Sequence, residues 1–568
     1  MRIHRRSLST VLAALVMTSL AGCSGGGGGD ASPISPNVTI PPSVTTPPIP
    51  PSITTTSLGQ GEVNLLFNAS LAADGTGPLT WQLTGGSLPA GITFHSSGTL
   101  TGTPTQEGQF LFTVRVTGPG GMISKDLTLV TLGSTHRVSV VSNTLGEANG
   151  PSGDHARSFD PGISNTGRFV VFDSAASNLV PNLNPNSKRQ VYLHDRQTGV
   201  TEMVSVTSAG LPGNDDSFVA TVSDDGNIVV FDSFASNYAG NDTGGVRDVF
   251  LRDRAAGTTQ RISQYITGTQ GVCAAITVNP LDCNSSDPSI SADGSIIAFA
   301  TWSQLTPDDT DEAHDVYVFN RTASSLQRIS VGIGGPPNGP SGSPAVSAEG
   351  RYITFSSLAN NLIVGDTVDT VSDIFVFDRQ TGILRKATGA FGGGAADGPS
   401  FGPSISGDGR FVAFWSQAAN LQSVPEATGF FDIFVADMQD SPASIKKIVN
   451  LQGAEGDGES RAPSISRDGK IIAFDSLATN LDDTLADGNG ARDIYVLDRS
   501  CSVTFNAGPC TFKRVSVASN GEASNGESRF AALSGDGKYV AYYSDADNLV
   551  PVIGDHNTFR DAFVTRRD

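Results

Sequence analysis

From about residue 135 to the C-terminus, short apolar runs alternate with sequences that form tight turns. Each run follows a Ser-x-x-Gly anchor, as where Ser406-Gly407-Asp408-Gly409 precedes the apolar residues 411–414. A glycine after Asp supplies the positive φ that a hairpin turn needs, and a short apolar run bounded by turn signals is typical of a buried strand. The pattern therefore predicts β-hairpins throughout this part of the chain.

The Ser-x-x-Gly anchor is repeated at nearly regular intervals. Its glycines lie 59, 68, 56, 59, 60 and 68 residues apart. They are Gly167, Gly226, Gly294, Gly350, Gly409, Gly469 and Gly537. A second apolar anchor, preceded by Asp in six copies, follows each glycine and predicts a third strand. Six segments such as Gln327-Arg328-Ile329-Ser330 then read as fourth strands, and we expect residues 136–140 to supply the seventh.

Seven four-stranded units, with the last completed by an N-terminal strand, predict a seven-bladed β-propeller over residues 135–568. Such closure leaves no open sheet edge and encloses a central channel. The turn and third-strand anchors resemble the TolB-type, WD-related propeller repeat over about 430 residues. The expected fold class is all-β.

Residues 57–133 predict a smaller β-domain. Apolar strands are expected at 63–69, 79–83, 110–117 and 124–132, with no helical periodicity between them. The run from Leu79 to Pro104, with Gly-Ser-Leu-Pro-Ala-Gly-Ile and Gly-Thr-Leu-Thr-Gly-Thr-Pro, resembles the putative-Ig, cadherin-like domain of bacterial surface proteins. The resemblance implies an Ig-like β-sandwich with Trp81 in its core. Some cadherin-like relatives bind calcium, but Asp74 and Asp126 are too few to establish a site here.

The N-terminus predicts export and lipid attachment. Basic residues precede the apolar stretch 8–20, which is long enough for a signal-peptide core and short for a membrane span. The following Leu20-Ala21-Gly22-Cys23 resembles the bacterial lipoprotein box, which implies a signal peptide at 1–22 and lipid on Cys23. Ser24 after the cysteine favours the outer membrane in that family. Residues 23–56, Gly-rich and then Pro-rich, predict an extended linker.

Composition narrows the classes of partner. The chain has 36 basic and 56 acidic residues, a formal net charge of −20. This excess of negative charge argues against binding to the phosphate backbone of a nucleic acid. It should also repel anionic lipid headgroups. Attachment to the membrane is therefore expected to depend on the lipid. The remaining partner classes are an envelope protein and an extracellular glycan.

Four further cysteines form two close pairs in the sequence, Cys273 with Cys283 and Cys501 with Cys510. Both pairs fall in the two 68-residue units. Export to an oxidising compartment favours two short-loop disulfides over free thiols, and there is no Cys-x-x-Cys motif that would indicate zinc.

Acidic residues recur between the second and third strands of the repeats. Their side-chain oxygens recur at a spacing that could bind Ca²⁺, and Ca²⁺ is the only cofactor that the sequence suggests. The candidate ligands are Asp242, Asp248, Asp309, Asp311, Asp315, Asp366, Asp369, Asp373, Asp487, Asn489, Asp493, Asp555, Asn557 and Asp561. The first repeat offers Asn184, Asn186 and Gln190 instead, and the fifth Glu426 and Asp432. Asx-turns that cap the incoming strand explain the same residues, and we favour that interpretation.

No catalytic residue is assigned from the sequence. A Gly-x-Ser-x-Gly nucleophile motif is absent, and the loop histidines His155, His314 and His556 have no metal-binding spacing. Because loops on a rigid scaffold commonly carry function, the face bearing the acidic loops is the expected ligand site. We therefore expect an outer-membrane lipoprotein that is a non-catalytic protein- or glycan-binding module. A TolB-like periplasmic scaffold and a propeller-type polysaccharide lyase or glycoside hydrolase are the alternatives.

Overall fold

The structure is a computed structural model, and it describes most of the chain from residue 46 onward. The described range is 46–567 without 143, 154–160, 185–186, 241, 243–244, 266–283, 312, 367–369, 424–428, 449–454, 483–484, 486, 500–510 and 552–553. Regular secondary structure in these residues is all β, as predicted. None of them belongs to a helix with the length and apolarity of a membrane span.

The Ig-like domain contains two main sheets and a short strand pair. One sheet has the order β2 (Gln60–Glu62), β9 (Gly121–Leu132), β8 (Gly108–Gly118), β5 (Thr80–Gly86). The second has the order β3 (Phe67–Ser70), β7 (Thr99–Gly102), β6 (Ile92–Phe94), and β1 (Ser52–Ile53) pairs with β4 (Ala73–Asp74). Trp81 packs in the core with Leu100 and Phe112, as predicted.

One strand prediction in this domain is wrong. The continuous strand expected over 63–69 is divided, because residues 63–66 leave β2 and form a turn before β3. Asn64 adopts φ 63°, a left-handed conformation that a continuous strand does not allow. The apolar pattern did not reveal this turn because Leu65 and Leu66 are exposed.

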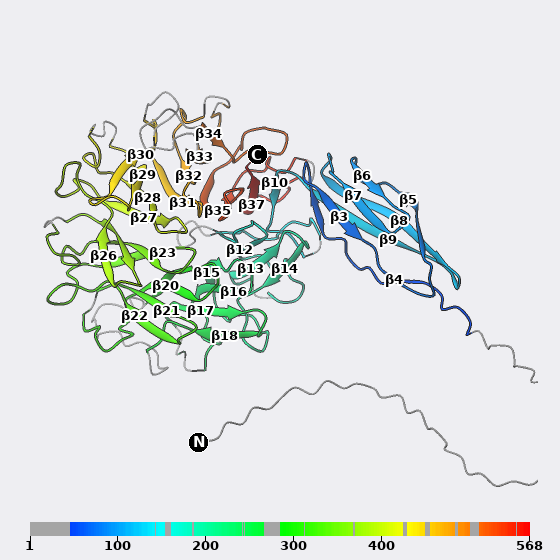
Figure 1. The fold of residues 1–568 in the computed structure, drawn as a ribbon, viewed down its shortest axis with the longest axis horizontal. Coiled ribbons are helices and arrows are strands. Elements are labelled where there is room, and N and C mark those ends of the chain that lie inside the picture. The colour runs from blue at the N-terminus through cyan, green and yellow to red at the C-terminus, as the bar shows by residue number, and fades with distance from the viewer. Residues whose placement is uncertain are drawn as a thin grey trace, which may run out of the picture. The chain divides into compact units, whose positions relative to one another are not determined.

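The rest of the chain forms seven four-stranded antiparallel sheets, the blades of a β-propeller. Figure 1 shows the sheets following one another around a common centre, from cyan through green and yellow to red. Blades 1 to 3 are β11 (Gly162–Ile163), β12 (Phe169–Ser174), β13 (Gln190–Asp195), β14 (Val200–Met203); β15 (Ser217–Val222), β16 (Ile228–Ser233), β17 (Asp248–Asp253), β18 (Thr258–Arg261); β19 (Ser285–Ile290), β20 (Ile296–Thr301), β21 (Asp315–Asn320), β22 (Ser325–Arg328). Blades 4 to 6 are β23 (Ser341–Val346), β24 (Tyr352–Ser357), β25 (Asp373–Asp378), β26 (Ile383–Lys386); β27 (Ser400–Ile405), β28 (Phe411–Ser416), β29 (Asp432–Asp437), β30 (Ser444–Lys447); β31 (Ser460–Ile465), β32 (Ile471–Ser476), β33 (Asp493–Asp498), β34 (Thr511–Arg514).

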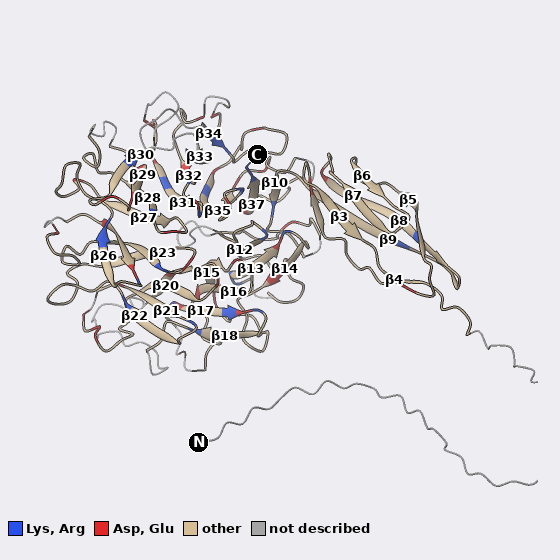
Figure 2. Cartoon of the chain, viewed as in Figure 1, with Lys and Arg blue, Asp and Glu red and all other residues tan. Residues whose placement is uncertain are grey.

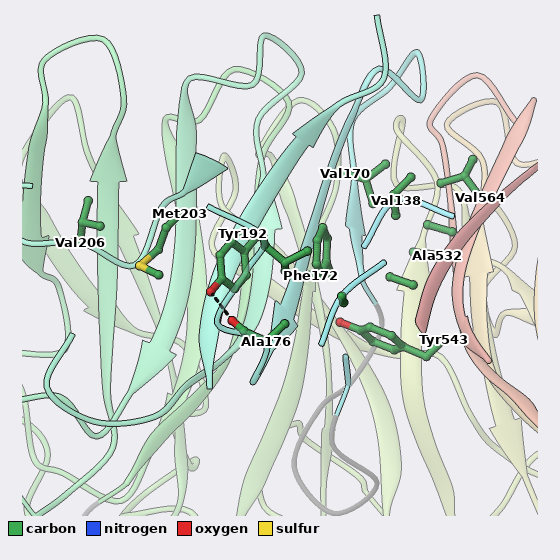
Figure 3. Packing of buried hydrophobic residues seen from close by; sticks show 14 residues of the cluster. Val138, Val170, Phe172, Ala176, Tyr192, Met203, Val206, Ala532, Tyr543 and Val564 are labelled. Atoms are coloured by element: carbon green, nitrogen blue, oxygen red, sulfur yellow. Dashed lines mark hydrogen bonds between the residues drawn. The ribbon is translucent and has the colours of Figure 1, made fainter. Parts of the chain in front are cut away.

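Blade 7 combines strands from both ends of this region. Its order is β10 (Thr135–Arg137), β37 (Asp561–Arg566), β36 (Tyr539–Ser544), β35 (Ser528–Leu533), so that β10 is the fourth strand. β10 is antiparallel to β37, with His136 opposite Val564. Figure 3 shows how blade 7 packs against blade 1: Val138 and Val564 lie close to Val170 in one buried cluster.

The serine of the repeated turn anchor accepts a backbone amide five residues later in all seven copies, and it donates to the anchor Asp in the five copies that have one. In blade 3, Ser291 Oγ donates to Asp293 Oδ1 at 2.6 Å, and Ser291 Oγ accepts the Ile296 amide at 3.0 Å. Gly294 follows with φ 69°, and the φ angles of all seven anchor glycines lie between 69° and 74°. The predicted role of these glycines is confirmed.

A stacked aromatic pair joins the second and third strands of each blade. Phe299 and Tyr317 of blade 3 have ring centroids 6.1 Å apart and an interplanar angle of 17°. Stacked pairs recur in the other blades between rings 5.8–6.1 Å apart. Offset aromatic pairs add to the stabilisation from burial, so the same element strengthens every blade.

An ion-pair network joins the Ig-like domain to the propeller. Glu62 of β2 accepts from Arg196 Nη2 at 2.9 Å and from Arg566 Nη1 at 2.8 Å. Burial raises the pKa of Glu62 above its usual value, although both arginines act to lower it. The Gln60 amide also donates to the Gln197 carbonyl at 2.9 Å, so the contact includes backbone as well as charge.

Candidate functional site

The acidic residues predicted between the second and third strands lie next to a basic side chain from the fourth strand. The first residue of the third strand is Asp in six blades, and the last residue of the fourth strand is Arg or Lys in the same six. Antiparallel pairing brings these two strand ends together. We call each such group a charge clamp; Figure 2 shows the basic end of β26 in blue.

The clamp of blade 3 is the most complete. Arg328 Nη1 lies 3.0 Å from an Asp309 oxygen, 2.8 Å from Asp311 and 3.0 Å from Asp315. The other clamps, with their shortest distances, are Arg261–Asp248 at 3.3 Å with Asp242 at 3.8 Å, Lys386–Asp373 at 2.6 Å with Asp366 at 2.8 Å, Lys447–Asp432 at 2.9 Å, Arg514–Asp493 at 2.8 Å with Asp487 at 3.7 Å, and Arg137–Asp561 and Arg137–Asp555, both at 3.2 Å.

Blade 1 lacks the charges of the clamp at both positions. Gln190 replaces the aspartate and Met203 replaces the basic residue. Gln190 Oε1 accepts a hydrogen bond from Ser205 Oγ at 2.7 Å, as Asp493 does from Ser516 at 2.6 Å. Because both charges are missing together, neither is left buried and unpaired.

The clamp geometry bears directly on the calcium hypothesis. Asp309, Asp311 and Asp315 are the one group among the described residues whose carboxylate oxygens lie close enough to share a metal, all within 4.8 Å. The guanidinium of Arg328 contacts all three, so a cation would have to displace it. Burial raises the pKa of Asp315 to about 7, against the effect of Arg328. The residues as arranged do not fit Ca²⁺, and calcium binding remains a prediction.

The Asx-turn interpretation applies to part of the same loops. Asp311 Oδ1 accepts the Ala313 amide at 2.9 Å, and Asn489 Oδ1 accepts the Ala491 amide at 2.7 Å. Asn557 Oδ1 accepts the Phe559 amide at 2.8 Å. Several of the predicted site residues lie outside the described residues: Cys23, Asn186, Cys273, Cys283, Asp369, Glu426, Cys501 and Cys510.

The loop histidines do not form a common group. His314 is partly buried, with its ring centroid 5.0 Å from that of Trp302, and desolvation lowers its pKa. His556 is exposed, and its Nδ1 lies 3.2 Å from Glu147 Oε1. His155 is outside the described residues.

The Ser-x-x-Gly turns surround one end of the propeller channel and are bonded to one another. The Asp224 amide donates to the Ala292 carbonyl at 2.9 Å, and the Arg467 amide donates to the Gly535 carbonyl at 3.0 Å. The side chain of Arg467, in blade 6, also forms an ion pair with Asp224 of blade 2. Because blades 2 and 6 are three positions apart in a ring of seven, this pair crosses the channel and obstructs the turn end.

The other end of the channel holds a cavity of about 710 Å³. Its walls are the first strands of the blades, from residues such as Ser289, Ser404 and Leu533 in the interior to Phe401 and Arg461 beside the strand starts. These starts follow the loops that join successive blades. The cavity is therefore reached from the loop face, which is the face the sequence predicts for a ligand.

The rim beside blades 5 to 7 is aromatic and basic. We call this part of the cavity the channel mouth; its residues are Phe401, Trp415, Arg461, Arg492, Arg529 and Phe530, with Phe431 packed behind Trp415. The guanidinium of Arg461 lies 5.2 Å from the Trp415 ring centroid and 5.1 Å from that of Phe431. Gly402 permits this packing, because a Cβ there would lie 2.5 Å from Trp415 Nε1.

Sequence reasoning missed these residues because it followed the repeated positions. Phe401, Arg461 and Arg529 each follow the first serine of a Ser-x5-Ser pattern shared by all blades. The equivalent residues of blades 2 to 4 are Phe218, Ser286 and Gly342. The position after this serine varies between blades although its neighbours are regular, and that variation could have indicated the candidate site.

Comparison with known proteins supports the Ig-like domain. A family model described as a putative Ig domain matches residues 41–135. None of the curated proteins compared with the chain matches it. Solved structures match the chain only at low sequence identity and low TM-score.

Three of these solved structures show how low the similarity is. The tricorn protease is 11% identical, with a TM-score of 0.28, over 80% of this chain and 41% of its own. A prolyl endopeptidase structure is 12% identical, with a TM-score of 0.39, over 83% and 55%. A protein of unknown function from Bacteroides thetaiotaomicron is 11% identical, with a TM-score of 0.28, over 75% and 95%. The chain thus spans about half the length of the two peptidases, and their activities are not carried over to it.

Proposed function

We propose that the protein is a lipoprotein of the bacterial outer membrane that binds a glycan or an envelope protein, without catalysis, through the loop face of its propeller. The observation that carries this proposal is the 710 Å³ cavity, which opens on the loop face and is obstructed at the turn end. Its volume lies within the roughly 300–1,000 Å³ that is usual for ligand pockets.

The contrast between scaffold and rim supports binding at this place. The anchor turns and stacked aromatic pairs repeat in all seven blades and the charge clamps in six, so together they form a regular frame. The rim residues differ from blade to blade, so they present one particular chemistry on a repeated frame. Rigid support of a variable surface is the usual arrangement for recognition sites.

Filling the cavity tests the proposal. The full chain and an Ala345→Trp variant are screened by thermal shift against soluble glycans and envelope peptides, because a ligand of the folded state raises the melting temperature. Ala345 lines the cavity, whereas Thr258 is exposed on the outer strand β18 and provides the control Thr258→Trp. We expect Ala345→Trp to abolish a ligand-induced shift that Thr258→Trp retains.

Two results would contradict the proposal. Ligand shifts that survive in Ala345→Trp would place binding outside the cavity. New unsaturated sugar ends released from a bound polysaccharide would instead support a lyase.

A further inference from the structure

We infer that the channel mouth binds the end of a carbohydrate chain that carries carboxylate groups, a hexuronate oligosaccharide being the simplest example. The inference rests on the proposed binding function and specifies its ligand class. It is drawn from the aromatic rings, the arginines and the backbone of the cavity wall.

The aromatic part of the mouth provides a stacking surface. Trp415 is partly exposed on the cavity wall, and its ring centroid lies 5.1 Å from Phe401 and 4.6 Å from Phe431. The edge-to-face contact with Phe431, at 73°, fixes the plane of the indole. A fixed, partly exposed indole can cover the apolar face of a sugar ring without losing side-chain freedom on binding.

Two arginines beside this surface keep hydrogen-bond donors available. Arg461 Nη2 lies 2.9 Å from Glu459, and Arg529 Nη2 donates to Glu527 at 2.6 Å. Their side chains are 39% and 33% exposed. A guanidinium has five N–H donors, and these ion pairs engage one nitrogen of each, so both can also bind a carboxylate.

The charges of the cavity wall are unevenly distributed. Blades 6 and 7 contribute Arg461, Arg492 and Arg529 against Asp475, and Asp475 is paired with Arg492 at 2.8 Å. The wall of blades 1 to 4 has one charged residue, Asp287, among the described residues. The carboxylates paired with Arg461 and Arg529, Glu459 and Glu527, are not lining residues, so the wall itself presents guanidinium donors, which suit a carboxylate ligand.

The backbone of the first strands argues against a peptide as the ligand. Peptides that enter a sheet pair with regular strand edges, and β-bulges prevent such pairing. The first strands of blades 2 to 7 all have a register shift, with a positive-φ residue at the cavity: Val219, Asp287, Ser343, Gly402, Ala462 and Phe530. Amides deeper in these strands are already bonded to the next blade, as Ile465 is to Ser404 Oγ at 3.1 Å.

Calorimetric titration of the purified full chain tests the inference. The probes are trimers of galacturonate, glucuronate and mannuronate, their methyl esters, a neutral glucose trimer, and a short peptide with a free C-terminal carboxylate. We expect at least one uronate trimer to bind, its methyl ester to bind about tenfold or more weakly, and its affinity to fall as salt rises.

Matched variants locate the site. Trp415→Ala and Arg461→Ala are each expected to weaken uronate binding about tenfold. Trp302→Ala removes another tryptophan, which is 39% exposed and does not line the cavity. Arg410→Ala removes an arginine that is likewise stacked on an aromatic ring, at 4.7 Å, and paired with an aspartate. Both controls should bind as the parent chain does. Melting temperatures show whether each variant is folded, and the methyl-ester comparison needs no variant.

The outcomes separate this inference from the proposed function. No binding of any uronate trimer, or equal binding of acid and ester, overturns the inference. If the neutral trimer or the peptide binds instead and Ala345→Trp abolishes that binding, the cavity remains a binding site and its ligand class is different.

Discussion

The charge clamps and the channel mouth both consist of charged side chains near the loop end of the blades, yet they are arranged differently. In the clamp of blade 3, Arg328 contacts three carboxylates and has a side chain only 4% exposed. At the mouth, Arg461 contacts one carboxylate, lies over two aromatic rings and is 39% exposed. The clamp recurs in six blades, whereas the Trp415–Arg461 pair occurs once.

The difference indicates which acidic or basic residues are available to a ligand. A clamp is complete within its own blade, since its basic residue is already engaged by the carboxylates that crowd it. The mouth retains donors and ring surface that the protein itself does not use. Repetition in this sequence therefore marks the scaffold, and departure from repetition marks the candidate site.

Breaking a clamp should have the largest effect on stability. Arg328→Met leaves buried carboxylates without their cationic partner, which typically costs about 3–5 kcal/mol. Urea unfolding of the full chain, followed by tryptophan fluorescence, measures the loss. Because blade 1 has Asn184, Gln190 and Met203 at the equivalent positions, adding Asp309→Asn, Asp311→Asn and Asp315→Gln should recover most of it. An additional loss in the combined variant would contradict the interpretation that Arg328 is needed because of the carboxylates around it.

A buried carboxylate with a distant partner should make stability depend on pH. Asp232 is fully buried, Arg247 Nη1 lies 3.6 Å away, and burial raises its pKa to about 7. The folded state therefore holds a proton that the unfolded state releases near pH 4, and this stabilisation is lost as pH rises from about 4 to about 7. Between pH 5 and pH 8, Asp232→Asn should gain on the order of 3 kcal/mol relative to the parent chain. The free energy of unfolding of both proteins is measured by denaturant titration at each pH. If the two curves run parallel between pH 5 and pH 8, Asp232 is ionised in the folded state throughout, which contradicts the prediction.

The ion pair at the turn end should contribute little to stability. Arg467 and Asp224 are each 33% exposed, and exposed pairs contribute about 0.2–1 kcal/mol. Arg467→Ala should lower the melting temperature slightly and leave binding at the mouth unchanged. Loss of mouth binding in this variant would mean that the turn end participates in the site.

Calcium should have the smallest effect. With Arg328 in contact with all three carboxylates, millimolar Ca²⁺ is expected to leave the melting temperature of the full chain unchanged relative to chelator. In Arg328→Met the same carboxylates have no such cation, and a calcium-dependent rise is expected there. A rise in the parent chain, reversed by chelator, would establish the calcium site that the sequence raises.

Much of the fold could be predicted because short sequence motifs, repeated in every blade, determine its turns and strands. Ser-x-Asp-Gly specifies its own turn through bonds within five residues, as Ser291, Asp293 and Ile296 show. The apolar runs that follow have the length of buried strands. The division of the expected strand at 63–69 was not predictable, because exposed Leu65 and Leu66 imitate the apolar pattern of a strand.

The candidate site was less predictable because its contacts are not local. Asp315 and Arg328 were both visible, but only the pairing of β21 with β22 brings them together. The sequence therefore showed acidic loops without their counter-charges, and it suggested that these loops bind a metal ion. Trp415 and Arg461 come from neighbouring blades, 46 positions apart in the sequence, and no spacing rule connects them. The loop face was the expected place for a ligand, but its chemistry depends on how the first strands converge.

The most direct test of the central claim is a crystal structure of the full chain with a uronate trimer that binds it. The account predicts a sugar ring against the indole of Trp415 and a carboxylate within hydrogen-bond distance of Arg461 or Arg529. A trimer bound over the clamp loops, with the channel mouth free of ligand, would contradict it.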